Sequence, residues 1–285
     1  MSITYTNTSP VKPKSIDAVG IVTFTDGTND VLPNQKQCEA YGYTYNQETG
    51  TCSAYNFNNI LERNIRNENN FVQGRGNRTE IGTDNTYIMG ENNTVQGYSR
   101  NNIIIGTGNE IENGINNAIV FGTKANAMND NSIVLGGNQG TDILGERQAI
   151  HLMYGRQTTQ GSETDSYLNN LQNNYFQPPE NSIFYFHADV IAVRVGHTGG
   201  GDPPAGSVGD YASWVERGVL INQSGTLRVN REKDAIKSNG TVTDWRPRSD
   251  VSGSNFIIKV RGETDVTIEW NCYVRMTQIQ TSVAL

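Results

Sequence analysis

The sequence predicts an all-β protein built from three parts: a small N-terminal β module, a parallel β-roll and a C-terminal antiparallel β-sandwich. The roll is predicted by a chain of Asn-x-x-x-x-Gly units between about residues 69 and 136. The sandwich is predicted by runs of alternating apolar and polar residues after about residue 181. Gly and Asn separate the units of the roll, as is typical of short strands joined by tight corners.

The composition excludes several classes of function. With 35% hydrophobic and 18% charged residues, the 285-residue chain is too apolar to be disordered. Its net charge of -7 repels phosphates, and no cluster of Lys and Arg offsets that charge, so we expect no nucleic-acid partner. No apolar run approaches 18 residues and the N-terminus has no apolar segment, so we expect neither membrane insertion nor export.

Residues 1–60 are predicted to form a small β module that attaches to a virion docking protein, caps the first coil of the roll, or does both. Two β-like runs, at 2–8 and 18–27, precede a hairpin that turns near residues 46–50. This turn places Cys52 opposite about Tyr45 and not opposite Cys38. A Cys38–Cys52 disulfide therefore needs a further bend of the chain, and free thiols are the favoured alternative. Cys272 lies on an apolar strand pattern and is expected to be buried.

The β-roll is assigned to residues 61–140 because its units recur at a fixed interval. Units follow one another about every eight residues and every second unit is alike, so the structural period is about sixteen. Gly74, Gly90, Gly106 and Gly122 lie sixteen residues apart, and Gly136 arrives two residues early. Two short strands in every sixteen residues make one coil of a β-solenoid.

The odd-numbered units carry apolar residues on both faces of their strands. Most hold three in a row, as in NNIIIG at 101–106, so both faces should be covered. One face can be covered by the roll interior, and we expect a second subunit to cover the other. An alternative is that flanking domains of the same chain cover it. The residues expected in the shaft core or at a trimer interface are Val72, Ile88, Ile104, Val120 and Val134.

The even-numbered units are predicted to be strands with one face inside the roll and one in water. Only their third position stays small or apolar, and the other positions are mostly polar. The residues at that third position, which should fill the interior, are Thr79, Thr94, Ile111 and Met128.

The units NNIIIG, NAIVFG and NSIVLG resemble the head repeats of trimeric autotransporter adhesins, which also occur in bacteriophage fibre proteins. The resemblance covers about a quarter of the chain and implies a left-handed parallel β-roll assembled as a homotrimer. The period of about sixteen is longer than the adhesin repeat, and neither a signal peptide nor a C-terminal membrane anchor is recognised. The resemblance therefore favours a phage fibre, assembled in the host cytoplasm and carried on the virion.

The repeat ends near residue 140, and two further segments follow it. Residues 141–180 are rich in turn signals and end near Pro178 and Pro179, so they are predicted to form a neck or linker. Residues 181–285 are predicted to form a β-sandwich tip. Its expected strands lie at about 182–196, 214–222, 225–229, 255–262 and 265–279.

No catalytic or metal motif stands out, so the chain is predicted not to be an enzyme and to hold no cofactor or metal. The Gly-rich segment 196–209 lacks the Gly-Lys-Ser/Thr that grips phosphates. His187 and Asp189 share a strand face but have no third ligand for a metal. A glycan-cleaving tailspike would need paired carboxylates, although charged surface residues are the favoured interpretation of the two pairs available. Those pairs are Glu163 with Asp165, and Asp210 with Glu216.

Three aromatic residues are candidates for receptor binding. Tyr211, Trp214 and Trp245 lie near Gly, Ser, Asp and Pro residues, so loops at one end of the sandwich could present them to a sugar. Core packing is nevertheless the default expectation for any single tryptophan, including Trp214, and it is stronger for Trp270.

These observations predict a structural component of a phage virion: a trimeric fibre that mediates adhesion to a glycan or protein of the host surface. A tail fibre is the preferred form. The alternatives are a capsid-mounted head fibre or decoration protein, and a glycan-degrading tailspike enzyme.

Overall fold

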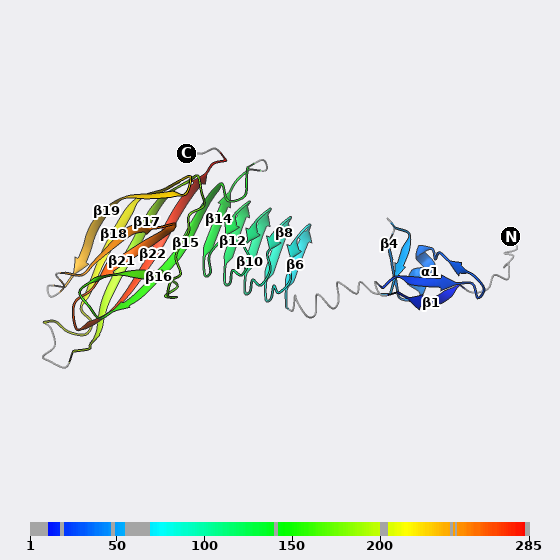
Figure 1. Cartoon of the computed structure of the whole chain (residues 1–285), viewed down its shortest axis with the longest axis horizontal. Helices are drawn as coiled ribbons and strands as arrows, with labels where there is room; N and C mark the ends of the chain where they lie inside the picture. The colour runs from blue at the N-terminus through cyan, green and yellow to red at the C-terminus, as the bar shows by residue number, and fades with distance from the viewer. Residues whose placement is uncertain are drawn as a thin grey trace. The chain divides into compact units, whose positions relative to one another are not determined.

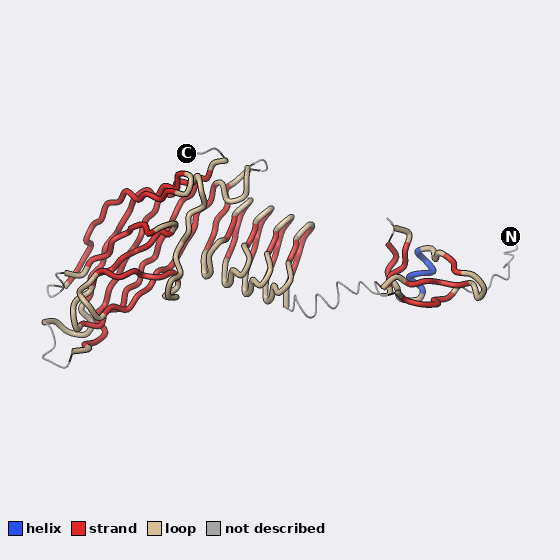
Figure 2. The backbone as a smooth tube through the Cα atoms, in the orientation of Figure 1, coloured by secondary structure: helices blue, strands red, loops and turns tan. Residues whose placement is uncertain are grey.

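The computed structural model forms two compact units, Met1–Glu68 and Asn69–Leu285, each considered by itself (Figure 1). It describes residues 11–17, 20–46, 49–54, 69–139, 142–199, 205–239, 242 and 244–282. Strands make up almost all of the regular structure in these residues (Figure 2). None of the helices described is long and apolar enough to cross a membrane.

The N-terminal unit contains five short strands and one helix. Strands β1, β2 and β3 pair antiparallel in one sheet, and β4 pairs with β5 in a hairpin. Val22 and Phe24 form its core with the two cysteines of the unit. The predicted strand at 2–8 lies outside the described residues. The elements are β1 (Lys12–Ile16), β2 (Val22–Thr25), β3 (Asp30–Val31), α1 (Gln35–Ala40), β4 (Thr44–Asn46) and β5 (Thr51–Ser53).

A disulfide joins Cys38 to Cys52, and both sulfurs are buried in the core of this unit. The hairpin places Tyr45 opposite Cys52, which is the register predicted from the sequence. The further bend that the bridge requires is supplied by helix α1, which carries Cys38 and begins with a capping box formed by Asn34 and Gln37. The expectation of free thiols is therefore wrong for Cys38 and Cys52, because helix α1, which the sequence pattern does not predict, supplies the bend.

A parallel β-solenoid with about sixteen residues per coil follows, as predicted. Strands one coil apart pair in register, so Ile104 lies between Ile88 and Val120. The long strands are β6 (Phe71–Arg75), β8 (Tyr87–Glu91), β10 (Ile103–Thr107), β12 (Ile119–Thr123) and β14 (Ile133–Gly137). The short strands, which form the second face, are β7 (Arg78–Thr79), β9 (Thr94–Val95), β11 (Glu110–Ile111) and β13 (Asn126–Ala127).

The residues of the short strands that fill the roll interior differ from the prediction in two coils: they lie one residue later in β9 and one residue earlier in β13. Val95 pairs with Thr79 and Ala127 pairs with Ile111, and Val95, Ile111 and Ala127 are fully buried. Thr94 and Met128, which were expected inside, are only half-buried. Asn93 and Ala125 occupy the corner position that Asn109 occupies in its own coil. The predicted units began at Asn92 and Asn126, so their positions were counted from one residue too early in β9 and from one residue too late in β13.

Glycine is required at the end of each long strand because neighbouring coils approach closely there. Gly90 and Gly106 have φ values of +133° and +140°, a region that residues with a Cβ rarely adopt. A Cβ at Gly90 would lie 1.9 Å from the carbonyl oxygen of Gly106. The sixteen-residue spacing of these glycines therefore follows from the close stacking of one coil's backbone on the next.

Asparagine side chains link successive coils through a ladder of hydrogen bonds. The Asn93 N–H donates to Asn77 Oδ1 (3.0 Å), and the Asn109 N–H donates to Asn93 Oδ1 (3.0 Å). The Asn109 side chain continues the ladder by donating Nδ2–H to the carbonyl of Gly122 (2.9 Å) and accepting from the N–H of Ala125 (2.9 Å). Backbone groups at the buried corners are thereby satisfied.

The C-terminal part consists of two facing antiparallel sheets. The larger has the order β19-β18-β17-β22-β15, and the smaller contains β20, β21 and β16. Phe186 of β17 and Phe256 of β21 meet between them, with ring centroids 5.2 Å apart. The strands are β15 (Arg147–Thr158), β16 (Glu163–Leu168), β17 (Ser182–His197), β18 (Tyr211–Gln223), β19 (Thr226–Ser238), β20 (Arg246–Ser252), β21 (Asn255–Arg261) and β22 (Val266–Gln280).

The segment 141–180, expected to be a neck, instead contributes to both sheets. Strand β15 pairs with β22 over twelve residues and with the last solenoid strand, β14. Strand β16 pairs with β15 and with β21, so it links the two sheets. The solenoid therefore continues into the C-terminal sheet without a separate neck.

We expect the Asn109→Ala variant to lose about 1–3 kcal/mol of unfolding free energy, because it leaves buried backbone groups without partners. The matched control is Asn113→Ala, at an exposed position of the same coil, which should change stability little. Denaturant unfolding of the two variants measures the difference. Equal stability would show that the ladder does not hold the coils together.

Candidate functional site

One sheet runs from the first coil of the solenoid to the far edge of the C-terminal part, and its outer face is the candidate functional surface. Strands β6, β8, β10, β12 and β14 continue into β15, β22, β17, β18 and β19 in unbroken hydrogen-bonded order (Figure 1). The change from parallel to antiparallel pairing occurs between β14 and β15, where Ile133 lies opposite His151. Side chains on the outer face of the solenoid are therefore continuous with those of the C-terminal sheet.

On the solenoid, this outer face carries two columns of apolar side chains. The columns flank the buried central column, since side chains alternate along each strand. Most of these side chains are between 36% and 52% exposed, and the remainder of the unit leaves them uncovered. We call them the shaft face: Phe71, Tyr87, Ile103, Ile119 and Ile133 in one column, and Met89, Ile105, Phe121 and Leu135 in the other.

The five residues predicted for the shaft core or a trimer interface belong to the central column. Ile88, Ile104, Val120 and Val134 are at most 1% exposed, so they form the shaft core and cannot contact a second subunit. Val72 occupies the same position in the first coil but is 45% exposed. The side chains available to another subunit are those on either side of this column.

The three aromatic residues predicted for receptor binding do not lie together in exposed loops. Trp214 is 7% exposed on β18 and stacks on Trp270, with ring centroids 5.6 Å apart. Trp245 is 5% exposed and packs against the same ring. Tyr211, the first residue of β18, is half-buried. Neither tryptophan is presented by an exposed loop, because both pack against Trp270. Trp245 is a core residue, whereas Trp214 also lines the hollow described below.

A polar cluster interrupts the outer face where the solenoid joins the C-terminal sheet. His151 Nδ1 lies 2.5 Å from the Tyr273 hydroxyl, and an Arg275 N–H donates to His187 Nδ1 (2.9 Å). The same guanidinium donates to Asp189 Oδ2 (3.0 Å). These five side chains come from the adjacent strands β15, β22 and β17. Each constrains its neighbour, so the cluster is a pre-organised polar group on a largely apolar face.

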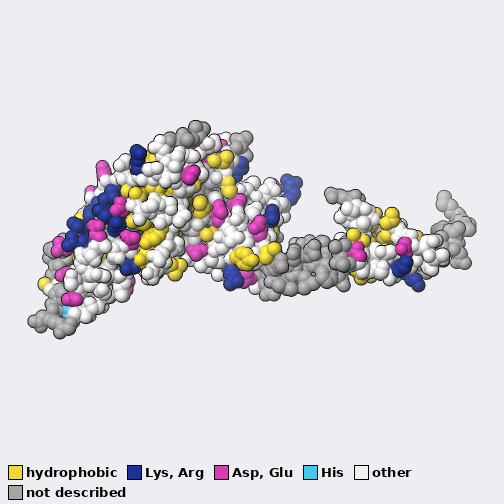
Figure 3. All heavy atoms as spheres, viewed as in Figure 1, with side chains coloured by type: hydrophobic (Ala, Val, Ile, Leu, Met, Phe, Trp, Pro, Cys, Tyr) yellow, Lys and Arg dark blue, Asp and Glu magenta, His cyan; other side chains and the backbone are white. Residues whose placement is uncertain are grey.

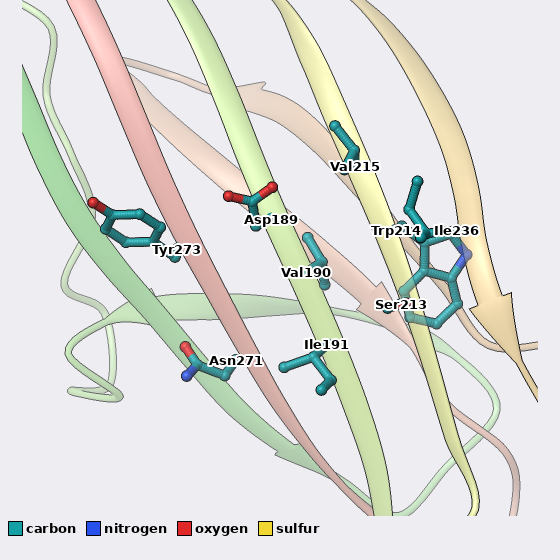
Figure 4. A pocket seen from close by; sticks show the side chains of 9 residues that line it. All are labelled: Asp189, Val190, Ile191, Ser213, Trp214, Val215, Ile236, Asn271 and Tyr273. Atoms are coloured by element: carbon teal, nitrogen blue, oxygen red, sulfur yellow. The ribbon is translucent and has the colours of Figure 1, made fainter.

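A shallow hollow of about 370 Å³ lies beside this cluster, on strands β17, β18, β19 and β22 (Figure 4). Its apolar side chains include Ile191, Val215 and Ile236, and Asp189 and Asn271 provide polar groups. Hydrophobic side chains also gather in patches on the surface of the C-terminal part, among Lys and Arg side chains (Figure 3). The arrangement is suited to binding an amphipathic ligand.

The acidic residues considered for metal or acid–base chemistry are engaged by other residues. The described residues contain no group of three or more His, Cys, Asp or Glu residues placed to hold a metal ion. The four carboxylates considered as acid–base pairs have other partners: Glu163 contacts Arg248 (3.0 Å), and Asp165 accepts a hydrogen bond from Tyr175 (3.2 Å). Glu216 is buried and accepts a hydrogen bond from the backbone N–H of Ser249 (2.5 Å). Asp210 accepts from Asn239 Nδ2 (2.5 Å).

The chain matches no protein-family model, and no curated protein matches it in sequence. Similar solved structures include a tailspike protein of an Acinetobacter phage, at 9% identity and a TM-score of 0.27, covering 75% of this chain and 54% of that one. Another is a tailspike protein of an Acinetobacter baumannii bacteriophage, described as a capsular polysaccharide depolymerase, at 9% identity and a TM-score of 0.26. That match covers 76% of this chain and 48% of the other. The chain thus spans about half the length of these tailspikes, and alignments this weak support no argument about its activity.

We expect His151 to titrate below its ordinary pKa of 6.5, first because of its burial and second because of the positive charge of Arg275. The residues paired with His151 are Ile133 on β14 and Arg275 on β22. A carboxylate at either position would raise the pKa of His151, but neither residue carries one. The folded protein then binds this proton less readily than the unfolded chain, and the contribution of His151 to stability falls as pH drops through 6.5. An NMR titration measures the shift.

In the same titration, the Arg275→Gln variant should raise the pKa of His151 toward the ordinary value without fully restoring it, because the burial remains. A wild-type His151 that titrates above the ordinary value would contradict the arrangement of the cluster.

Proposed function

We propose that this protein is a trimeric fibre of a bacteriophage virion that attaches the particle to the host surface. The observation that carries the proposal is the shaft face, two parallel columns of exposed apolar side chains repeated over successive coils. Contiguous apolar surface of this kind marks an interaction site in a soluble protein. A fibre assembled from several copies would remove it from water.

The composition of the shaft face suits contact with other copies of the chain. Its columns carry no charged side chain, and a polar rim borders them at the positions after each glycine. That rim includes Arg75 and Glu91, which approach to 3.8 Å. An apolar centre bounded by polar groups is the common composition of subunit interfaces. The assembly of three subunits follows from the resemblance of the repeats to those of trimeric head domains.

The alternative that the chain covers its own apolar stripe is not supported within the unit that contains it. The columns stay 36% to 52% exposed at most positions although the whole C-terminal sheet is attached to the same solenoid. The C-terminal sheet extends this surface edge to edge and does not fold over it.

We assign attachment to the particle to residues 1–60 and contact with the host to the C-terminal sheets. The disulfide-containing N-terminal unit is compact by itself, which fits a separate docking module. The C-terminal sheets carry the hollow and the polar cluster, which fit binding of a glycan or protein. A tail position is preferred to a capsid position, and adhesion without glycan cleavage is preferred to a depolymerase. Three copies on each fibre would raise the avidity of weak contacts.

Substitutions at two adjacent residues of β10 distinguish loss of subunit assembly from loss of the subunit fold. Ile105→Asp places a charge on the shaft face, where Ile105 is 40% exposed, and should abolish the trimer while leaving the solenoid folded. Ile104→Asp buries a charge in the shaft core and should unfold the solenoid. Sedimentation velocity and circular dichroism of both variants test this.

A trimeric Ile105→Asp variant with wild-type melting would contradict the assignment of the shaft face to subunit contact. Release of oligosaccharides from host envelope by the wild-type protein would instead favour the depolymerase.

A further inference from the structure

The hollow on the outer face of the C-terminal sheet is shaped by an irregularity in strand pairing. The register of β18 and β19 shifts between Ser213 and Trp214, so Ser213 pairs with Lys237 and Trp214 pairs with Ala235. Ile236 is the extra residue of this β-bulge and lines the hollow, where it is 60% exposed. Bulges turn side chains away from the regular alternation of a strand and are frequent beside functional sites.

One side of the hollow presents a carboxylate held in a fixed position. Asp189 Oδ2 accepts a hydrogen bond from Arg275 (3.0 Å), and its other oxygen lies 3.4 Å from His187 Nε2. The carboxylate is nevertheless 45% exposed, which leaves acceptor capacity for a ligand.

Asn271 supplies the second polar group. On the paired strands β17 and β22, Asp189 lies opposite Tyr273 and Ile191 lies opposite Asn271, so Asp189 and Asn271 are diagonal neighbours. Such residues are about 7 Å apart, a separation that one sugar ring with its hydroxyls can span. Asn271 is exposed, and its side-chain amide has no hydrogen-bond partner within the part of the chain that the structure describes.

This combination matches the chemistry of an uncharged pyranose. A pyranose ring offers C–H groups on its faces, which pack on apolar side chains such as Ile191, Val215 and Ile236. Its hydroxyls both donate and accept, so they can donate to the Asp189 carboxylate and exchange hydrogen bonds with the Asn271 amide. An acidic sugar would bring its own carboxylate close to Asp189 and is disfavoured.

We propose that the hollow is a subsite for a neutral hexose or N-acetylhexosamine unit of a host surface glycan. The inference rests on the adhesive role proposed above and gives that role a site and a ligand class. Because the hollow is open and accepts one unit, the affinity for a free monosaccharide should be about millimolar.

The test is saturation-transfer NMR of the full chain with methyl glycosides of glucose, galactose, mannose and N-acetylglucosamine, with glucuronic acid as the charged comparison. At least one neutral glycoside should bind, at concentrations up to about 50 mM, and glucuronic acid should bind more weakly. Asn271→Ala and Asp189→Asn should each weaken that binding about tenfold or more. The control is Thr277→Ala, an exposed position on the same face of β22 that does not line the hollow, and it should bind as the wild type does.

Three results would overturn the proposal: no neutral glycoside binds, either hollow variant binds like the wild type, or glucuronic acid binds as well as the neutral sugars. Sedimentation of the same samples separates this inference from the proposed fibre. A trimer that binds no sugar contradicts the subsite alone, whereas a monomer that binds sugar contradicts the trimer alone. If Asn271→Ala dissociates a wild-type trimer, the hollow is a subunit contact and the proposal is wrong.

Discussion

The rest of the structure depends on the in-register stacking of one coil of the solenoid on the next. Stacking requires the backbone at Gly90 to approach the carbonyl of Gly106 closely, which only a residue without a Cβ permits. It also requires partners for the buried backbone groups at the corners, and the ladder through Asn77, Asn93 and Asn109 supplies them. Together these two requirements explain why Asn and Gly mark the repeat. Apolar residues then fill the space that the stacked corners enclose.

Stacking also determines where the exposed apolar side chains lie. In-register pairing aligns equivalent residues of successive coils, so a buried central column is flanked by two columns that face outward. Pairing of β14 with β15 carries the same outer face onto the C-terminal sheet, where the polar cluster around Arg275 and the hollow beside Asp189 are found. The proposed surface for assembly and the proposed surface for adhesion are thus parts of one sheet face.

The sequence predicted the features that recur or alternate. The sixteen-residue period, together with apolar residues on both strand faces in units such as NNIIIG, was sufficient to predict the solenoid. Alternation in Ile150, Leu152 and Tyr154 could have revealed β15, but the turn residues around it suggested a neck. Pattern alone did not separate Ile104, which is inside, from Ile105, which is outside, because both are isoleucine.

Features that depend on contacts distant in the sequence were not predicted. Trp214 and Trp245 are buried because both meet Trp270, which no local pattern reveals. The hollow requires a bulge opposite Ser213 and the alignment of Asp189 with Tyr273 across two strands. Cys38 reaches Cys52 because a short helix bends the chain. The capping box is the one sequence signal of that helix.

The most direct test of the central claim, that the shaft face is a contact between three copies of the chain, is the mass of the wild-type protein in solution. Light scattering at micromolar concentration should give three times the 31.4 kDa mass of one chain. A mass equal to that of a single chain, with the solenoid folded, would show that the apolar columns remain exposed to water and would contradict the account.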